Sequence, residues 1–287
     1  MRIACIGEAM IELSMAGEDT QVGVAGDTLN TAIYLHRTAP ALSVDYLTCL
    51  GDDPFSKRIL DFIANQGVGT APVRQIAGAS PGLYAITTTP EGERSFTYWR
   101  SAAAARQLFT DGGFSILEGY DAVYLSGISM AILPHSVRLA FIEWLTTAPI
   151  KVIYDSNYRP RLWDSVEHAR QITAALWARA DIALPSIDDE MLLFGETAAE
   201  VTARFAKHRG IGALKRGEEG PFSLGQKVQQ SYPPAGKVVD TTAAGDSFNG
   251  GYLGAFLSGQ NQSEALMAGH TLAAAVVQHR GAIMPDG

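Results

Sequence analysis

The sequence predicts an α/β fold, because short apolar strands alternate with amphipathic helices along most of its 287 residues. The expected strands cover residues 2–7, 44–50, 122–126, 151–155 and 181–184. The expected helices cover residues 28–37, 54–66, 136–146 and 166–179. This alternation is typical of βαβ units, so we expect three layers, with a mainly parallel central sheet between helices. Such sheets bind ligands at the carboxyl ends of their strands.

Composition and charge describe an ordinary globular chain and argue against several classes of partner. Of the residues, 47% are hydrophobic and 18% are charged, and the length suits one large domain. The formal net charge of −8 argues against nucleic acid or an anionic membrane as a partner. An anionic small-molecule substrate therefore needs local cations, from arginine, lysine or a bound metal ion.

Cysteine usage and the start of the chain favour a cytoplasmic location. Cys5 and Cys49 lie in separate apolar runs, so we expect reduced thiols without a disulfide or a metal. Residues 1–7 predict a buried strand in place of a signal peptide, and no stretch approaches the ~18 apolar residues that span a bilayer. Residues 277–287 end abruptly, which leaves open whether further residues follow.

Two β-rich segments interrupt the alternation of strands and helices. Residues 12–26 alternate weakly, and residues 83–89 and 94–100 flank a hairpin signal at residues 90–93. Together these segments predict a small sheet that stands off the main domain.

The register of this hairpin decides which aromatic side chain lies beside Tyr84. An even loop sets Tyr84 beside Trp99, whereas an odd loop sets it beside Tyr98 and Arg100. The sequence leaves both registers open. It also leaves open whether the aromatic residues pack the small sheet or contact a ligand.

Arginines mark the expected ligand site. Arg100 closes the aromatic strand, where a charge either reaches solvent or binds an anion. Arg159 and Arg161 follow the strand at residues 151–155, at its carboxyl end. One interpretation is that both are solvated loop residues. The other is that the Arg159 guanidinium binds a carboxylate or phosphate through two N–H groups.

The most informative segment covers residues 240–251. Small residues that let backbone N–H groups face a ligand end in Asp246, just before an apolar helical pattern. A helix N-terminus with free N–H groups binds anions. A carboxylate there is either a simple helix cap or a base that takes a proton from an attacking hydroxyl.

This segment resembles the D-T-x-G-A-G-D signature of the ribokinase, or phosphofructokinase-B, family of sugar kinases, with Ala243 where glycine is usual. The resemblance implies a ribokinase-like fold in one domain, residues 1–287, with a β lid formed by about residues 9–26 and 82–101. It implies that Asp246 is the general base, and that the N–H groups of Ala243, Ala244 and Gly245 stabilise the transferred phosphoryl group.

Longer strings narrow the resemblance to the 2-keto-3-deoxygluconate kinases of that family. Residues 98–100 (Tyr-Trp-Arg) and 157–163 (Asn-Tyr-Arg-Pro-Arg-Leu-Trp) discriminate best. The implied reaction transfers the ATP γ-phosphoryl group to the terminal hydroxyl of 2-keto-3-deoxygluconate, whose carboxylate matches two arginines. The alternatives are a fructokinase or other neutral-sugar kinase, or an idle sugar-binding sensor.

The same resemblance assigns the remaining contacts. The implied substrate contacts are Gly26, Asp27, Asn30, Tyr84, Tyr98, Arg100 and Arg159, with Ala25 replacing a usual glycine; Asp27 is alternatively only a helix N-cap. The implied nucleotide contacts are Asn157, Lys215, Gly217, Gly220, Thr241, Gly245 and Asn249.

Metal ions and assembly are further implications. Residues 186–189 occupy the place of an N-x-x-E motif that organises Mg²⁺ through water. The resemblance therefore assigns this Mg²⁺ contact to Asp189, with Asp188 or Glu190 as alternatives. An acidic helix N-terminus explains these residues equally well. A monovalent cation such as K⁺ beside Asp240, and a dimer or larger homo-oligomer formed through the lid, are left open.

Overall fold

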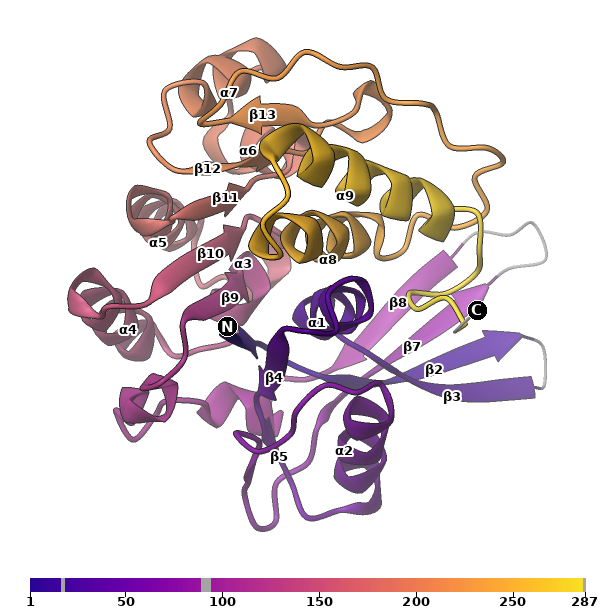
Figure 1. The fold of residues 1–287 in the computed structure, drawn as a ribbon. Helices are drawn as coiled ribbons and strands as arrows, with labels where there is room; N and C mark the ends of the chain where they lie inside the picture. Colours follow the sequence, from indigo (N-terminus) through magenta and orange to yellow (C-terminus); the bar gives the residue numbers. More distant parts are fainter. Residues whose placement is uncertain (17–18, 89–93, 286–287) are drawn as a thin grey trace.

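The structure, a computed structural model, describes residues 1–16, 19–88 and 94–285. Within these residues, a seven-stranded central sheet has the order β13-β12-β11-β10-β9-β1-β4 (Figure 1). The strands are β1 (Arg2–Ile6), β4 (Ser43–Leu47), β9 (Ala122–Ser126), β10 (Lys151–Asp155), β11 (Ile182–Leu184), β12 (Ile211–Leu214) and β13 (Phe222–Leu224). Neighbouring strands are parallel except for the antiparallel pair β12 and β13. The predicted mainly parallel sheet is confirmed.

Helices cover both faces of this sheet, as the alternation predicted (Figure 1). One face carries α1 (Asp27–Thr38), α2 (Pro54–Asn65), α8 (Ala244–Leu257) and α9 (Gln262–Val276). The other carries α3 (Gly127–Ala131), α4 (His135–Thr147), α5 (Val166–Arg179), α6 (Ile187–Phe194) and α7 (Ala198–Phe205).

Strand β1 shows why the sheet needs two helical layers. Its side chains alternate between the faces, with Ile3 and Cys5 packed into one hydrophobic cluster and Ala4 and Ile6 into the other. All four residues are at most 1% exposed. A strand buried on both faces reads as a continuous apolar run, which is the pattern that predicted it.

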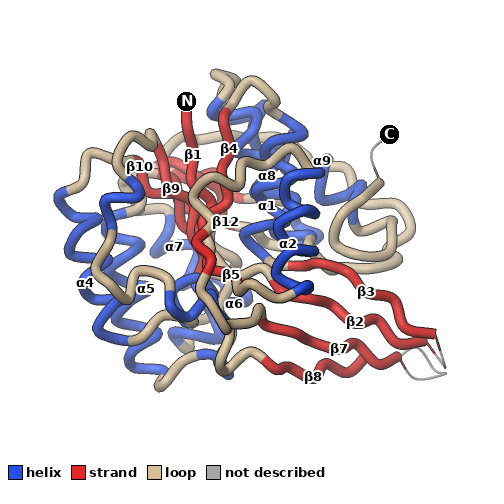
Figure 2. Tube along the Cα trace, turned by 90° about the horizontal axis from the view of Figure 1, so that it is seen from below, coloured by secondary structure: helices blue, strands red, loops and turns tan. Residues whose placement is uncertain are grey.

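A smaller four-stranded sheet extends away from this body (Figures 1 and 2). Its strands are β3 (Asp19–Ala25), β2 (Met10–Ala16), β7 (Gly82–Thr88) and β8 (Arg94–Trp99), in that order. Tyr84 pairs with Tyr98, and their rings stack at 5.5 Å, which is the odd-loop register. The predicted turn at residues 90–93 lies outside the described residues.

The structure also departs from the predicted elements. The single strand expected at residues 44–50 is interrupted at Thr48, giving β4 in the central sheet and β5 (Cys49–Leu50), which pairs with β6 (Arg74–Gln75). Short 3₁₀ helices complete the chain: η1 (Ala104–Gln107), η2 (Phe114–Leu117), η3 (Pro160–Leu162) and η4 (Gly217–Glu219). Among the described residues, no helix has the length and apolar character needed to cross a membrane.

Candidate active site

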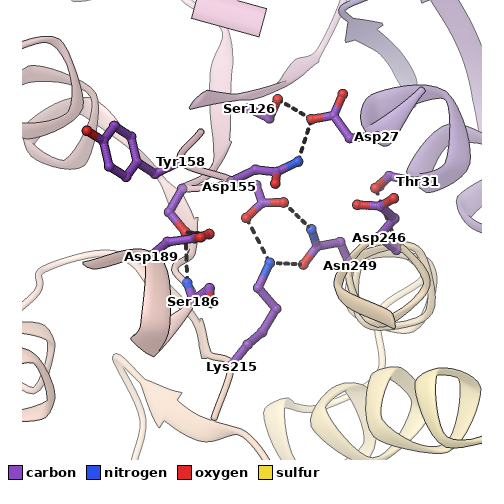
Figure 3. A network of polar contacts seen from close by, with 12 residues as sticks. Asp27, Thr31, Ser126, Asp155, Tyr158, Ser186, Asp189, Lys215, Asp246 and Asn249 are labelled. Carbon is purple, nitrogen blue, oxygen red and sulfur yellow. Dashed lines mark hydrogen bonds and ion pairs between the residues drawn. The ribbon is translucent and has the colours of Figure 1, made fainter. Parts of the chain in front are cut away.

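A cleft of about 1620 Å³ lies at the carboxyl ends of the central strands, beside the small sheet. It is lined from the small sheet by Tyr84, Tyr98 and Arg100, from strand ends by Asp155 and Lys215, and from the start of α8 by residues 243–246. Figure 3 shows the polar groups that meet at its base. Gly26 also lines the cleft, so positions as far apart as Gly26 and Asp246 meet at the edge where parallel sheets bind ligands.

Asp246 lies in the first turn of α8 and does not cap the helix. The helix begins at Ala244, and its cap residue Ala243 makes no side-chain cap bond. Instead, the Asp246 carboxylate accepts a hydrogen bond from Asn30 Nδ2 at 2.9 Å. Burial and the nearby charge of Asp27 raise the pKa of Asp246 to about 8. Such a pKa suits a group that accepts a proton near neutral pH.

Several backbone N–H groups at the start of α8 are not used by any part of the chain that the structure describes. The N–H groups of Ala243, Gly245 and Asp246 donate to no acceptor among the described residues. The N–H of Ala244 donates to the Thr241 carbonyl at 3.2 Å, so it is engaged within the turn. The three free donors at a helix N-terminus form a site for an anion.

Lys215 approaches the same helix terminus from the end of β12. Its Nζ donates to Asp155 at 2.7 Å and to Asn249 Oδ1 at 3.1 Å (Figure 3). A Cβ placed on Gly245 would lie 3.8 Å from this Nζ, so the ammonium group borders the free N–H groups. Asn249 is itself fully buried and is not among the residues that line the cleft, and its amide oxygen helps to hold Lys215 in place.

Asp27 forms a second network on the opposite wall. Its carboxylate accepts from Ser126 Oγ at 2.5 Å and from Asn157 Nδ2 at 2.6 Å. Helix α1 begins at Asp27 after Gly26, so the N-cap interpretation of Asp27 is wrong. Gly26 is required by packing, because a Cβ there would lie 2.4 Å from the Glu8 carbonyl oxygen.

Both predicted anion-binding arginines line the cleft, and each is already paired with a carboxylate. Arg100 forms an ion pair with Glu8, and the two side chains are 11% and 1% exposed. Arg159 Nη1 lies 3.3 Å from Asp189 Oδ1, with the Arg159 side chain 54% exposed. The unpaired arginine charges that the sequence suggested are therefore partly compensated within the protein. Arg159 has the more accessible guanidinium.

Tyr84 and Tyr98 face the cleft from adjacent strands of the small sheet. The Tyr84 hydroxyl donates to Glu12, which fixes its ring against Tyr98. The two rings form an apolar wall above the polar base of the cleft.

The candidate metal ligands differ in whether their side chains reach the cleft. Asp188 and Asp189 line the cleft, and burial raises the pKa of Asp189. Glu190 points away and binds Arg204 and Trp177, so it is not a cleft ligand. Asp240 joins two loops, because its carboxylate accepts from the N–H groups of Thr242 and Gly281, each at 3.0 Å.

Of the two glycines assigned to the nucleotide after β12, one lines the cleft and the other does not. Gly217 has φ +56° and lines the cleft, whereas Gly220 has φ +75° and packs against Tyr232, away from the lining. Both positive φ values favour glycine. Thr241 lies on the cleft surface, as a nucleotide contact requires.

Comparison with known proteins identifies the family. Residues 1–286 match the sequence profile described as "pfkB family carbohydrate kinase". This chain belongs to the pfkB family of carbohydrate kinases. It is 42% identical to a 2-dehydro-3-deoxygluconokinase of Dickeya dadantii over 299 residues, which span 99% of this chain and 96% of that protein.

Two further relatives agree with this assignment. A 2-dehydro-3-deoxygluconokinase of Escherichia coli is 41% identical over 300 residues, spanning 99% of this chain and 97% of that protein. The crystal structure of a PfkB protein from a Polaromonas species superimposes with a TM-score of 0.83 at 27% identity, covering 96% of this kinase and 95% of that chain. The predicted ribokinase-like fold is confirmed.

In this kinase, the departure at Ala243 has a structural cost. Ala243 has φ +60° and ψ +17°, the left-handed conformation that glycine adopts without strain. The kinase therefore keeps the motif's backbone conformation although the side chain disfavours it. The turn that presents the free N–H groups is retained.

The sequence assigned Asp155, Tyr124 and Glu8 no role as ligand contacts. Asp155 is the last residue of β10 and Glu8 follows β1 after Gly7, and these places at the carboxyl ends of strands were the available signal. Tyr124 lies within β9, and its hydroxyl accepts from Asn249 Nδ2 at 3.0 Å. A tyrosine inside an apolar strand carries no such signal.

Proposed function

We propose that this kinase transfers the γ-phosphoryl group of ATP to the terminal hydroxyl of 2-keto-3-deoxygluconate, giving 2-keto-3-deoxy-6-phosphogluconate. The observation that carries the proposal is Asp246, a carboxylate of raised pKa beside free N–H groups, in a cleft that also holds Arg100 and Arg159. Identity of 41–42% over 99% of the chain to 2-dehydro-3-deoxygluconokinases supports the choice of substrate.

Asp246 is the proposed general base. Its carboxylate takes the proton of the terminal hydroxyl while that oxygen attacks the γ-phosphorus. The bond from the γ-phosphorus to the β–γ bridging oxygen breaks, and ADP leaves with those electrons. Asn30 orients the carboxylate through its 2.9 Å hydrogen bond. The free N–H groups of Ala243 and Gly245, with that of Asp246, stabilise charge on the phosphoryl oxygens.

The polyphosphate of ATP is proposed to lie along the start of α8. Lys215, Gly217 and Thr241 line the cleft on that side. The Lys215 ammonium borders the helix terminus, where it offsets phosphate charge. Asn157 also lines the cleft, where its amide group donates to Asp27, and it is the proposed nucleotide contact on that wall.

Two cations are proposed for this site. Asp188 and Asp189 present carboxylate oxygens to the cleft, and these are the ligands that Mg²⁺ prefers, directly or through water. Bound Mg²⁺ would neutralise the ATP phosphates. Asp240, which joins the motif loop to the loop of Gly281, would hold a monovalent cation such as K⁺.

Recognition of the sugar acid is assigned to Arg159 and to the part of the cleft beside the small sheet. Arg159 is half exposed and would exchange part of its contact with Asp189 for the substrate carboxylate. Arg100 is held by Glu8 and lines the cleft, where N–H groups not used by Glu8 would contact the substrate. Gly26, Asp27 and Asn30 would contact the sugar hydroxyls, while Tyr84 and Tyr98 pack on its carbon chain.

The small sheet is proposed to act as a lid over the sugar, excluding water from the phosphoryl transfer. Exposed apolar side chains also suggest pairing of two copies through this sheet. Met15, Val22 and Trp99 are 40%, 36% and 58% exposed. Light scattering of the protein as purified measures the mass directly, and a Trp99→Glu variant of lower mass would support this pairing.

A coupled assay of ADP release with Mg²⁺ tests the proposed substrate. The sugar acid, fructose and ribose are compared at equal concentrations. We expect kcat/KM for 2-keto-3-deoxygluconate to exceed that for either neutral sugar at least about tenfold, since each good contact to a charged group contributes about 1.5–3 kcal/mol. A preference for fructose or ribose would keep Asp246 as the base and reject the arginine assignment.

A further inference from the structure

A cluster of two histidines and a carboxylate joins two helices on the face of the sheet away from α8. His135 is the first residue of α4, and His168 lies in the first turn of α5. Asp164 immediately precedes Ser165, the cap residue of α5. Among the described residues, these three offer ligand atoms that all lie within 4.8 Å of one another.

Each of the two imidazoles has a buried nitrogen that makes no hydrogen bond within the described chain. Nδ1 of His135 and Nδ1 of His168 are buried and make no hydrogen bond to any described residue. The rings stack with centroids 4.0 Å apart and planes 17° apart. Buried polar atoms normally find a hydrogen-bond partner. His168 Nδ1 also lies 3.8 Å from Asp164 Oδ2. The stacked rings direct their lone pairs side by side, so one ring would rotate for both nitrogens to meet a shared ion.

Asp164 is held in place by a buried arginine. Arg138 is 1% exposed and donates from Nη1 to Asp164 Oδ2 at 2.8 Å. The same guanidinium donates to the carbonyl oxygens of Met130 and Ala131. Ligating carboxylates are commonly oriented by such an outer hydrogen bond. The other carboxylate oxygen, Oδ1, accepts no hydrogen bond from the described residues and is left for a ligand.

We propose that His135, Asp164 and His168 bind a divalent transition-metal ion of the Zn²⁺ class. Two imidazoles and one carboxylate form a donor set that suits Zn²⁺, with water in the fourth position. Mg²⁺ requires oxygen ligands and would not compete effectively for two nitrogens. The ion would tie the start of α4 to the start of α5, directly after the segment that carries Arg159.

Co²⁺ is the probe, because four-coordinate nitrogen and oxygen sites give it strong visible absorption bands. The full chain, free of any affinity tag and treated with chelator, is titrated with Co²⁺ and then with Zn²⁺. We expect one Co²⁺ per chain with strong bands that Zn²⁺ abolishes. His135→Gln and His168→Gln should each weaken Co²⁺ binding at least about tenfold. His279→Gln, at an exposed histidine elsewhere, should bind as the unmodified protein does.

A second readout guards against loss of the fold. Zn²⁺ should raise Tm of the unmodified protein and of His279→Gln, but not of His168→Gln, because only a bound ion stabilises the folded state. Asp164→Asn keeps an oxygen for Arg138 and should also weaken Co²⁺ binding. Weak bands typical of six oxygen ligands, or equal Co²⁺ affinity in the histidine variants and the control, would overturn the proposal.

Discussion

The ionisation of Asp246 should control the rate of phosphoryl transfer near neutral pH. Burial and the neighbouring Asp27 raise its pKa to about 8. At pH 7, about one carboxylate in eleven would then be ionised and able to accept the substrate proton. We therefore expect kcat/KM to rise about tenfold between pH 6 and pH 7, and to level off above about pH 9.

A charge variant links this profile to its cause. Asp27→Asn removes a negative charge that raises the pKa of Asp246, so the midpoint of the profile should move to lower pH. Asp27 is also a proposed substrate contact, so its substitution could change the maximal rate for another reason. The midpoint of the pH profile is therefore the quantity compared. Glu218→Gln is the matched control, since Glu218 lines the cleft but is not among the groups that shift Asp246.

The assay is ADP release with 2-keto-3-deoxygluconate at saturating ATP and Mg²⁺, measured from pH 5.5 to pH 9.5. Stability across this range is checked by thermal unfolding of the same samples. A flat profile from pH 5.5 to pH 8.5 would refute the raised pKa. An unchanged midpoint in Asp27→Asn would refute its assigned electrostatic cause.

Three further substitutions test separate parts of the site. Asp246→Asn should lower kcat by ~10²–10⁴. The raised pKa means that the Asp246 side chain supports the folded state fully below about pH 4, and that this contribution is lost as the pH rises through about 8. At pH 9 the variant should therefore have a free energy of unfolding about 1–3 kcal/mol above that of the unmodified kinase, seen as a higher Tm. Ala243→Gly should relieve the left-handed conformation and stabilise the fold by about 0.5–1 kcal/mol, seen as a higher Tm with kcat unchanged; a lower Tm would contradict the strain. Arg159→Met should raise KM for the sugar acid about 10–100-fold with little effect on KM for ATP, whereas equal effects on both substrates would place Arg159 elsewhere.

The sequence predicted those parts of the fold whose signal is local. Residues 122–126 and 151–155 are apolar runs of strand length, and both strands form with the predicted bounds. Residues 211–214 form β12 although two of the three preceding residues are polar and the strand itself contains Gly212. Gly212 packs against Ala183, where a Cβ would lie 1.8 Å from the carbonyl oxygen, and no local pattern reveals that contact.

The site was predictable in its residue types but not in its pairings. Asp246 stands in a recognisable motif, the resemblance to the family assigned Lys215, and both line the cleft. The ion pair between Arg100 and Glu8 joins residues 92 positions apart and depends on how the small sheet approaches β1. Long-range contacts of this kind follow from tertiary packing, so the sequence suggested two free arginine charges where the structure has compensated ones.

We propose above all that this cleft selects its substrate through the substrate's carboxylate. The most direct measurement compares kcat/KM for 2-keto-3-deoxygluconate and for 3-deoxyfructose, which carries a hydroxymethyl group in place of that carboxylate and is otherwise the same. We expect the acid to be preferred by about 10–100-fold, and Arg159→Met to remove most of the difference. Equal turnover of the two compounds by the unmodified kinase would contradict it.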